Sequence, residues 1–310
     1  MPQVSIARLF EDNREKLGLE WVAGRDGGAK ELNSEHTRDS SQGLIGHLNF
    51  IHPNLIQVLG TSEVAYLDKL DAPNCHKALA QVAIKELACF IVAGVDRAPA
   101  SLAAVAEATH TPLFRSPVAS VELMWMLRPY LARALAESTT THGVLLDVLG
   151  MGVLITGDSG VGKSELALEL VSRGSGLVAD DVVELYRIGP ETLEGRCPAL
   201  LKDFLEVRGL GVLNIRTIFG EAALRPRKNV KLIVNLGKPT ARMERLPLNA
   251  GSENIMGVDI RKVTIPVAAG RNLAVLTEAA VRNYVLQLRG FDSTQEFVSR
   301  QSQEMQKRES

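Results

Sequence analysis

The feature that most constrains this chain is the octapeptide GDSGVGKS at residues 157–164, which satisfies the pattern G-x-x-x-x-G-K-[ST]. An apolar run at 153–155 precedes it directly, and a leucine-containing stretch at 165–171 follows it. Glycines let successive backbone N–H groups turn toward one centre at a helix N-terminus, where the helix dipole favours anions. The order of strand, glycine-rich loop and helix therefore predicts a phosphate-binding loop, against the alternative of a simple glycine-rich turn.

In such a loop the backbone surrounds the phosphates of ATP, the lysine reaches the β- and γ-phosphates, and the hydroxyl holds Mg²⁺. Those last two roles fall to Lys163 and Ser164. The predicted nucleotide-binding residues are Gly157, Asp158, Ser159, Gly160, Val161, Gly162, Lys163 and Ser164.

A second short apolar run ends in two carboxylates, Asp180 and Asp181. This is the pattern of a strand that delivers acids to the phosphate end of a parallel sheet. One carboxylate could join the Mg²⁺ shell, and the other could accept a proton from an attacking hydroxyl. A turn-forming Asp-Asp pair without a chemical role is the alternative.

Two further segments carry charges suited to phosphate chemistry. Residues 204–214 form a flexible, glycine-containing segment with Glu206 and Arg208, which fit Mg²⁺ and phosphate oxygens but also a plain surface ion pair. Further along lies a basic cluster, which is either a solvated charge run or a docking patch for an acidic ligand or protein. Its members are Arg225, Arg227, Lys228 and Lys231.

The length of 310 residues predicts two domains. The polar stretch ESTTT at 137–141 is the expected linker, so that residues 1–136 form a small N-terminal α/β domain and residues 137–310 a phosphate-loop kinase domain. The first domain has no motif of its own and is expected to serve packing, oligomerisation or regulation. Its expected strands lie at 57–60, 89–95 and 112–114, its helices at 101–108 and 120–135, and an exposed loop or a long turn at 24–42.

In the second domain we expect two strands, at 144–149 and 153–155, joined across Gly150-Met151-Gly152. Pro129 should disturb the last helix of the first domain. The polar residues 296–310 should end the chain as a solvated helix or a frayed tail. The fold class is α/β throughout.

Charge and hydropathy exclude several classes of protein. The chain has 35 basic and 36 acidic residues and a formal net charge of −1, so no global field draws it to nucleic acid or to an anionic membrane. No apolar run approaches the roughly 20 residues of a membrane span, and the charged N-terminus lacks the apolar core of a signal peptide. We expect a cytoplasmic protein.

Four stretches of the chain resemble the HPr kinase/phosphorylase family, whose members phosphorylate a seryl residue of the phosphocarrier protein HPr and also remove that phosphate. They are THGVLLDVLGMGVLITGDSGVGKSELALELVSRG, LVADDVVE, FLEVRGLGVLNIRTIFGEAALR and VTIPVAAGRNLAVLTEAAVRNY, in that order. The segment EVRGLGVLNIR is the most specific. The N-terminal half, including QVLGTSEVAYL, is also similar, so the resemblance spans nearly the whole chain.

The resemblance implies ATP and Mg²⁺, HPr as partner, a homohexamer, and inorganic phosphate and pyrophosphate as co-substrate and product of the reverse reaction. It implies that Lys163 is catalytic and that Glu206 is a Mg²⁺ ligand beside Ser164. Asp181 matches the acid/base residue, and His142 matches an active-site histidine that orients either the phosphate or Asp181.

The resemblance also assigns two segments nearer the C-terminus. Arg245, in Glu-Arg-Leu, matches the catalytic arginine of an Asp-Arg-Leu pattern. Residues 205–214 match the loop that serves both activities, and 266–271 match the segment tied to dephosphorylation. Ala268 and Ala269 stand where the family pattern has arginine and proline, and the missing cation bears on the strength of the phosphorylase activity.

Two other functions fit the motif alone. A phosphate loop fixes the phosphoryl donor and leaves the acceptor open, so a kinase for a small metabolite is one alternative. A binding module whose loop acts as a nucleotide switch is the other. The carboxylate pair and residues 206–214 argue against the switch, because a binding module needs no proton acceptor beside the γ-phosphate.

Overall fold

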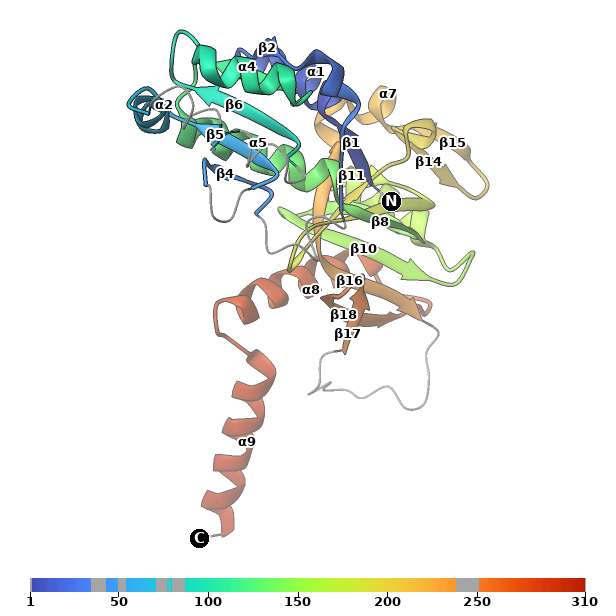
Figure 1. Cartoon of the computed structure of the whole chain (residues 1–310). Coiled ribbons are helices and arrows are strands. Elements are labelled where there is room, and N and C mark those ends of the chain that lie inside the picture. Colours follow the sequence, from blue (N-terminus) through green and yellow to red (C-terminus); the bar gives the residue numbers. More distant parts are fainter. Residues whose placement is uncertain are drawn as a thin grey trace. The chain divides into compact units, whose positions relative to one another are not determined.

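A computed structural model describes residues 2–34, 43–49, 54–70, 77, 79, 87–237 and 251–309 (Figure 1). The chain divides into two compact units, Met1–Glu137 and Ser138–Ser310.

The first unit is built on a sheet with the strand order β2-β7-β6-β5-β4, in which β4 to β7 are parallel and β2 is antiparallel to β7. β5 and β6 are buried along their whole length, as the apolar runs predicted. The elements are β1 (Gln3–Ser5), α1 (Ile6–Leu17), β2 (Glu20–Ala23), η1 (Arg25–Ala29), β3 (Glu31–Asn33), β4 (Ile45–His47), β5 (Ile56–Leu59), α2 (Thr61–Leu67), β6 (Cys89–Ala93), α4 (Ala100–Ala108), β7 (Leu113–Ser116) and α5 (Ser120–Ala134).

Two local predictions for this unit need correction. Pro129 lies inside α5, and the helix continues past it to Ala134. The expected exposed loop at 24–42 contains η1 and β3 in its described part, and Gly27 and Leu32 are buried there. A Cβ atom at Gly27 would lie 2.1 Å from the carbonyl oxygen of His110, so this glycine permits close backbone packing rather than marking an exposed loop. Residues 35–42 lie outside the described residues.

The second unit carries the larger sheet, with the strand order β11-β9-β10-β16-β13-β12-β8; β18 pairs with β16, and β17 pairs with β18. Its elements are β8 (Glu137–His142), β9 (Val144–Val148), β10 (Met151–Gly157), α6 (Lys163–Ser172), β11 (Gly176–Ala179), β12 (Val182–Gly189), β13 (Thr192–Arg196), η2 (Ala199–Leu201), β14 (Phe204–Val207), β15 (Gly211–Asn214), α7 (Ile215–Phe219), η3 (Glu221–Ala223), β16 (Arg227–Gly237), β17 (Gly251–Ile255), β18 (Val258–Pro266), α8 (Leu273–Leu288) and α9 (Ser293–Glu309).

Four strands of this sheet run in the same direction, so their carboxyl ends lie along one edge of the sheet. β16 is parallel to β10 and to β18, and the three lie side by side in Figure 1. β11 is separated from β10 by β9, which is antiparallel to both, so β11 runs in the same direction as β10. The predicted acid-bearing strand therefore ends at the expected edge, but its hydrogen-bonded neighbour is antiparallel rather than parallel.

The helices of this unit pack on the sheet through alternating side chains. Val153 and Ile155 of β10 face a core that includes Leu166 and Leu170 of α6, whereas Leu154 faces a second core on the other side of the sheet. This alternation follows from the two-residue period of a strand. With α6 packed on this face of the sheet, its first residues lie at the edge where β10 ends.

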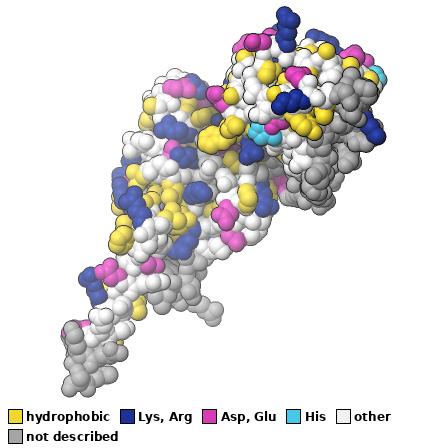
Figure 2. Space-filling model, turned by 60° about the vertical axis from the view of Figure 1, so that its left-hand side comes forward, with side chains coloured by type: hydrophobic (Ala, Val, Ile, Leu, Met, Phe, Trp, Pro, Cys, Tyr) yellow, Lys and Arg dark blue, Asp and Glu magenta, His cyan; other side chains and the backbone are white. Residues whose placement is uncertain are grey.

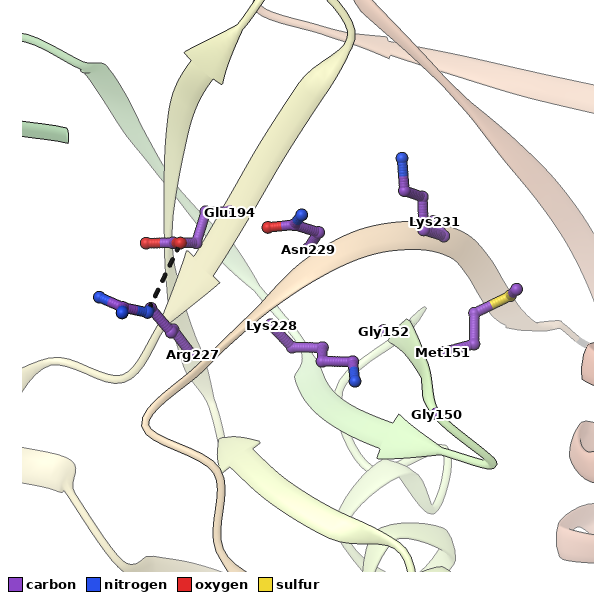
Figure 3. Close-up of a pocket in the computed structure, with 8 residues that line it drawn as sticks. All are labelled: Gly150, Met151, Gly152, Glu194, Arg227, Lys228, Asn229 and Lys231. Atoms are coloured by element: carbon purple, nitrogen blue, oxygen red, sulfur yellow. Dashed lines mark ion pairs between the residues drawn. The ribbon is translucent and has the colours of Figure 1, made fainter. Parts of the chain in front are cut away.

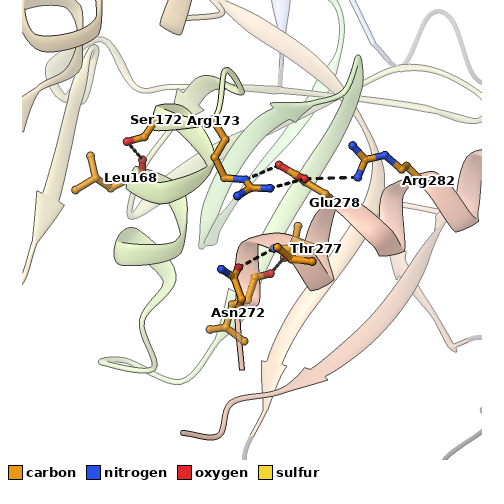
Figure 4. Close-up of polar contacts among 9 residues, drawn as sticks. Leu168, Ser172, Arg173, Asn272, Thr277, Glu278 and Arg282 are labelled. Atoms are coloured by element: carbon orange, nitrogen blue, oxygen red, sulfur yellow. Dashed lines mark hydrogen bonds and ion pairs between the residues drawn. The ribbon is translucent and has the colours of Figure 1, made fainter. Parts of the chain in front are cut away.

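A cluster of charges connects α6 to α8 (Figure 4). Arg173 donates from Nε and Nη2 to the two carboxylate oxygens of Glu278, at 2.8 and 2.9 Å. Arg282, one turn further along α8, lies 3.5 Å from the same carboxylate. Asn272 caps the start of α8 by accepting from the backbone N–H of Val275. The helix that follows the phosphate loop is thereby fixed to the C-terminal part of the sheet domain.

The Arg173–Glu278 contact makes the free energy of unfolding depend on pH in a defined direction. Hydrogen bonding to Arg173 lowers the pKa of Glu278. A carboxyl with a lowered native pKa stabilises the fold above its unfolded pKa of about 4.3, and this contribution is lost as the pH falls through the native value. We expect Glu278→Gln to lower the melting temperature by roughly 2 °C at neutral pH, and by less as the pH approaches 4. Thermal unfolding followed by circular dichroism at both pH values tests this.

Glu296→Gln provides the matched control, because Glu296 pairs with Arg300 on the exposed helix α9. Exposed i,i+4 pairs contribute little to stability, so this variant should melt with the wild type at every pH. A Glu278→Gln deficit that did not change with pH would mean that the carboxylate charge is not what stabilises the contact.

The C-terminal polar segment forms α9, whose described side chains are mostly exposed, as expected for a solvated helix. On the face drawn in Figure 2, basic and acidic side chains are interspersed, in keeping with the net charge of −1. Across the described parts of the chain, every helix is too short or too polar to cross a membrane.

Candidate functional site

The glycine-rich loop joins the end of β10 to the start of α6. Gly157, Gly160 and Gly162 have φ angles of 143°, 75° and 100°, a region that glycine enters without steric cost. A Cβ atom at Gly157 would lie 2.5 Å from the carbonyl oxygen of Leu236, so a side chain is excluded there. Gly162 is the N-cap of α6, which puts the first N–H groups of that helix at the loop. This is the geometry that the octapeptide predicted for binding an anion.

Lys163 lies folded over the loop. Its Nζ atom donates to the carbonyl oxygens of Gly157 and Asp158, both at 3.0 Å. The ammonium group is therefore held beside the backbone that would surround the phosphates, with a third N–H available for a ligand oxygen.

Asp180 is the buried acid of the site. Its side chain accepts from the Ser164 hydroxyl at 3.1 Å on one oxygen, and from the backbone N–H of Glu206 at 2.9 Å on the other. The residue is 5% exposed, and burial raises its pKa while both hydrogen bonds act to lower it. The residues by themselves left the roles of the two aspartates open, and the family resemblance implied a role only for Asp181; the contact with Ser164 is what singles out Asp180.

Asp181 occupies a different environment, although it is the next residue. Its side chain is 74% exposed, and its Oδ1 lies 3.7 Å from Nδ1 of His142, which is also exposed. Its φ angle of 64° is unusual for a residue other than glycine, and aspartate tolerates it better than most. The carbonyl oxygen of Asp181 accepts from the N–H of Gly143 at 3.0 Å, which fixes the turn beside His142.

The segment at 204–214 is not a flexible loop, because its residues pair as the antiparallel hairpin β14-β15. The backbone N–H of Glu206 donates to Asp180. Among the described residues, the Glu206 carboxylate makes no hydrogen bond with Ser164 or Asp180. Arg208 lies against the phosphate loop, since a Cβ atom at Gly160 would be 3.3 Å from its Nη1. The described residues contain no ion pair between Glu206 and Arg208.

The C-terminal candidates lie at the same edge or outside the described residues. β18 ends at Pro266 beside Gly237 of β16, and the N–H of Val267 donates to the Gly237 carbonyl at 2.9 Å. Ala268 and Ala269 follow and are exposed. Arg245 falls within 238–250, outside the described residues, so its predicted role stays a prediction.

The donor set fits Mg²⁺ without a preformed cage. Among the described residues there is no group of three or more histidine, cysteine or acidic side chains arranged for a metal. A phosphate-loop site needs only a hydroxyl and a carboxylate, because the phosphates and water supply the other oxygens. Ser164 and Asp180 provide that pair, in contact with each other.

A phosphate loop at the carboxyl end of a strand, with its serine hydrogen-bonded to a buried carboxylate, is the arrangement of a phosphate-loop phosphotransferase. Comparison with known families gives a match of residues 4–131 to the HPr Serine kinase N terminus and of residues 133–301 to the HPr Serine kinase C-terminal domain. The chain belongs to the HPr serine kinase family. The resemblance seen in the sequence is thereby confirmed.

Relatives match along nearly their whole length. An HPr kinase/phosphorylase of Nitrosomonas europaea is 62% identical over 309 residues, covering 98% of this chain and 96% of the relative. One of Chromobacterium violaceum is 56% identical, covering 97% and 95%. A solved structure of the Hpr(Ser) kinase/phosphatase from Coxiella burnetii is 38% identical, covering 51% of this chain and 98% of that one, with a TM-score of 0.47.

Proposed function

We propose that this protein transfers the γ-phosphoryl group of ATP to a seryl residue of an HPr-type phosphocarrier protein, and reverses the modification with inorganic phosphate. Family membership and the names of the relatives support the substrate. The single observation that carries the chemistry is the convergence of Ser164 and the Glu206 amide on Asp180, next to an exposed Asp181.

The two aspartates divide the work according to their surroundings. Asp180 is buried and hydrogen-bonded on both oxygens, which suits a residue that orients Ser164 and shares a metal ion. Asp181 is exposed, so the hydroxyl of a protein substrate can reach it. In the forward reaction Asp181 accepts the serine proton as the serine oxygen attacks the γ-phosphorus, and the bond to the β-phosphate oxygen breaks.

In the reverse reaction an oxygen of inorganic phosphate attacks the phosphorus of phosphoserine. The bond to the serine oxygen breaks, Asp181 returns a proton to that oxygen, and pyrophosphate leaves. Lys163 stabilises charge on the transferring group in both directions, and Arg245 is proposed to do the same. His142 acts as a positioning residue, because its ring lies 3.7 Å from the Asp181 carboxylate.

Mg²⁺ bound with ATP would neutralise charge on the β- and γ-phosphates. Ser164 and Asp180 would hold it, and Glu206 is proposed as a further ligand from the family pattern. A homohexamer, a cytoplasmic location and a regulatory or oligomerisation role for residues 1–136 belong to the same proposal.

Asp180→Asn tests the division of labour. The amide keeps the shape of the side chain but loses the charge that attracts the metal, so the Mg²⁺ concentration needed for half-maximal rate should rise by about 10- to 100-fold. Titration of Mg²⁺ at saturating ATP measures this. Glu206→Gln should give the smaller rise, because its carboxylate makes no contact with Ser164 in the described residues. Equal effects would assign the metal to both side chains alike.

The overall function is tested by incubating the purified protein with Mg²⁺-ATP and purified HPr and measuring the intact mass of HPr. We expect the gain of one phosphoryl group, which added inorganic phosphate then removes with release of pyrophosphate. HPr whose acceptor serine is replaced by alanine is the control. Gain without reversal would trace to the exposed Ala268-Ala269 segment, and absence of any gain would favour a small-molecule kinase.

A further inference from the structure

A pocket lies at the starts of the central strands, whereas the phosphate loop lies at their ends (Figure 3). It has a volume of about 400 Å³ and lies at the starts of β10 and β16 and beside β13. β10 runs from Met151 beside this pocket to Gly157 of the loop, and six steps of about 3.3 Å per residue separate the two by roughly 20 Å. The pocket is therefore separate from the nucleotide site.

One wall of this pocket consists mainly of backbone atoms of residues 150–152. Leu149 and Gly150 have φ angles of 54° and 86°, which make a tight turn between β9 and β10. Gly152 follows, and a Cβ atom there would lie 2.1 Å from the carbonyl oxygen of Asn229 on β16. Only glycine lets β10 approach β16 this closely. The wall is thus free of bulky side chains apart from Met151.

Glu194 is the only acidic side chain among the described residues that line the pocket. It is 3% exposed, and one of its oxygens accepts from Arg196 Nε at 2.8 Å. Its other oxygen lies 3.7 Å from Nε of Arg227, as Figure 3 shows on one side of the pocket. Arg196 makes the closer contact, so Arg227 retains much of its capacity for an anion in the pocket.

Lys228 also forms an ion pair with a buried acid, Asp147. Its Nζ lies 2.9 Å from Oδ2 of Asp147, and Nε of Arg225 lies 3.3 Å from the same oxygen. One carboxylate therefore faces two cations. The ammonium of Lys228 has three N–H donors, of which Asp147 uses one.

Lys231 supplies charge that no acid balances within the described residues, where it makes no ion pair or hydrogen bond. It is exposed between the buried Val230 and Leu232, and Figure 3 shows it across the pocket from Arg227. The basic cluster of the sequence is thus neither a plain solvated run nor a flat patch. Three of its members line a hollow with an excess of positive charge.

We propose that this pocket binds a small multivalent oxyanion, either a phosphate monoester or a di- or tricarboxylate. The volume falls in the range of small-ligand sites, roughly 300–1,000 Å³. Arg227 offers a planar fork for two oxygens, Lys231 offers an ammonium donor across the pocket from it, and Lys228 offers a second ammonium donor. The neutral side chain of Asn229 adds an amide between them.

The test uses the full-length protein with its phosphate loop saturated by Mg²⁺ and a non-hydrolysable ATP analogue. Glycerol 2-phosphate and citrate are titrated separately by calorimetry at low ionic strength. Saturable binding of one anion per chain is expected for at least one probe, and it should weaken as salt is added. Binding of the phosphate ester alone, or of citrate alone, decides which oxyanion the site takes.

Lys231→Glu should weaken anion binding by about tenfold or more, since a donor to a charged ligand is replaced by a repelling charge. Asn229→Asp, which changes a different exposed position, should act in the same direction. Lys202→Ala, an exposed lysine outside the pocket, is the matched control and should bind both anion and nucleotide as the wild type does. The proposal fails if neither probe binds the nucleotide-saturated protein, or if both pocket variants bind as tightly as the wild type.

Discussion

Replacing Asp181 with asparagine should lower the rate of HPr phosphorylation by about 10²- to 10⁴-fold, the usual contribution of general acid–base catalysis. Asparagine has nearly the same shape and also tolerates the φ angle of 64°, but its amide cannot accept the serine proton. The side chain is 74% exposed, so the core is not disturbed. Nucleotide affinity should stay unchanged, because the phosphates are predicted to contact residues 157–164 and not Asp181.

The forward rate is measured by intact mass of HPr, the reverse rate by pyrophosphate release, and nucleotide affinity by titration with an ATP analogue. Both rates should fall together, since one carboxylate serves as base in one direction and as acid in the other. Glu191→Gln, which alters an exposed carboxylate in the turn between β12 and β13, is the control. A variant of Asp181 that kept either rate near the wild-type value would remove this residue from the proton-transfer step.

Replacing Lys163 with alanine should lower the phosphorylation rate by about 10²- to 10³-fold, the typical cost of losing one preorganised donor to a transition state. It should also weaken nucleotide binding, unlike the change at Asp181. The ammonium contacts the carbonyl oxygens of Gly157 and Asp158, so its loss also removes two bonds that hold the loop. Rate and nucleotide affinity together distinguish the two variants.

Lys202→Ala controls for the loss of a positive charge from the same unit, and it should leave both quantities unchanged. Thermal unfolding of each variant establishes that the fold persists. If Lys163→Ala turned over HPr at close to the wild-type rate, the phosphoryl group would have to be stabilised by another cation at this edge. Arg208, which lies against Gly160, would then be the first residue to replace.

The amino-acid sequence predicted the parts of the site that are continuous along the chain. The octapeptide at 157–164 lies between β10 and α6 as expected, because its glycines and its apolar flanks specify a strand, a turn and a helix locally. Fold class and family were also readable, since apolar periodicity and motif order are properties of the sequence. The roles of His142, Lys163, Asp181, Glu206 and Arg245 stay predictions until the variants are measured.

The resemblance implied a role for Asp181, but only the tertiary structure showed how different the surroundings of Asp180 and Asp181 are. As neighbours in sequence they carry the same chemistry, but Asp180 is covered by Ser164 and by a hairpin that begins 24 residues later at Phe204, whereas Asp181 faces outward. The same holds for the basic residues of β16, whose partners Asp147 and Glu194 lie far away in sequence. Local pattern fixes which chemical groups are present, but burial and pairing arise from contacts between distant segments, and these decide what each group can do.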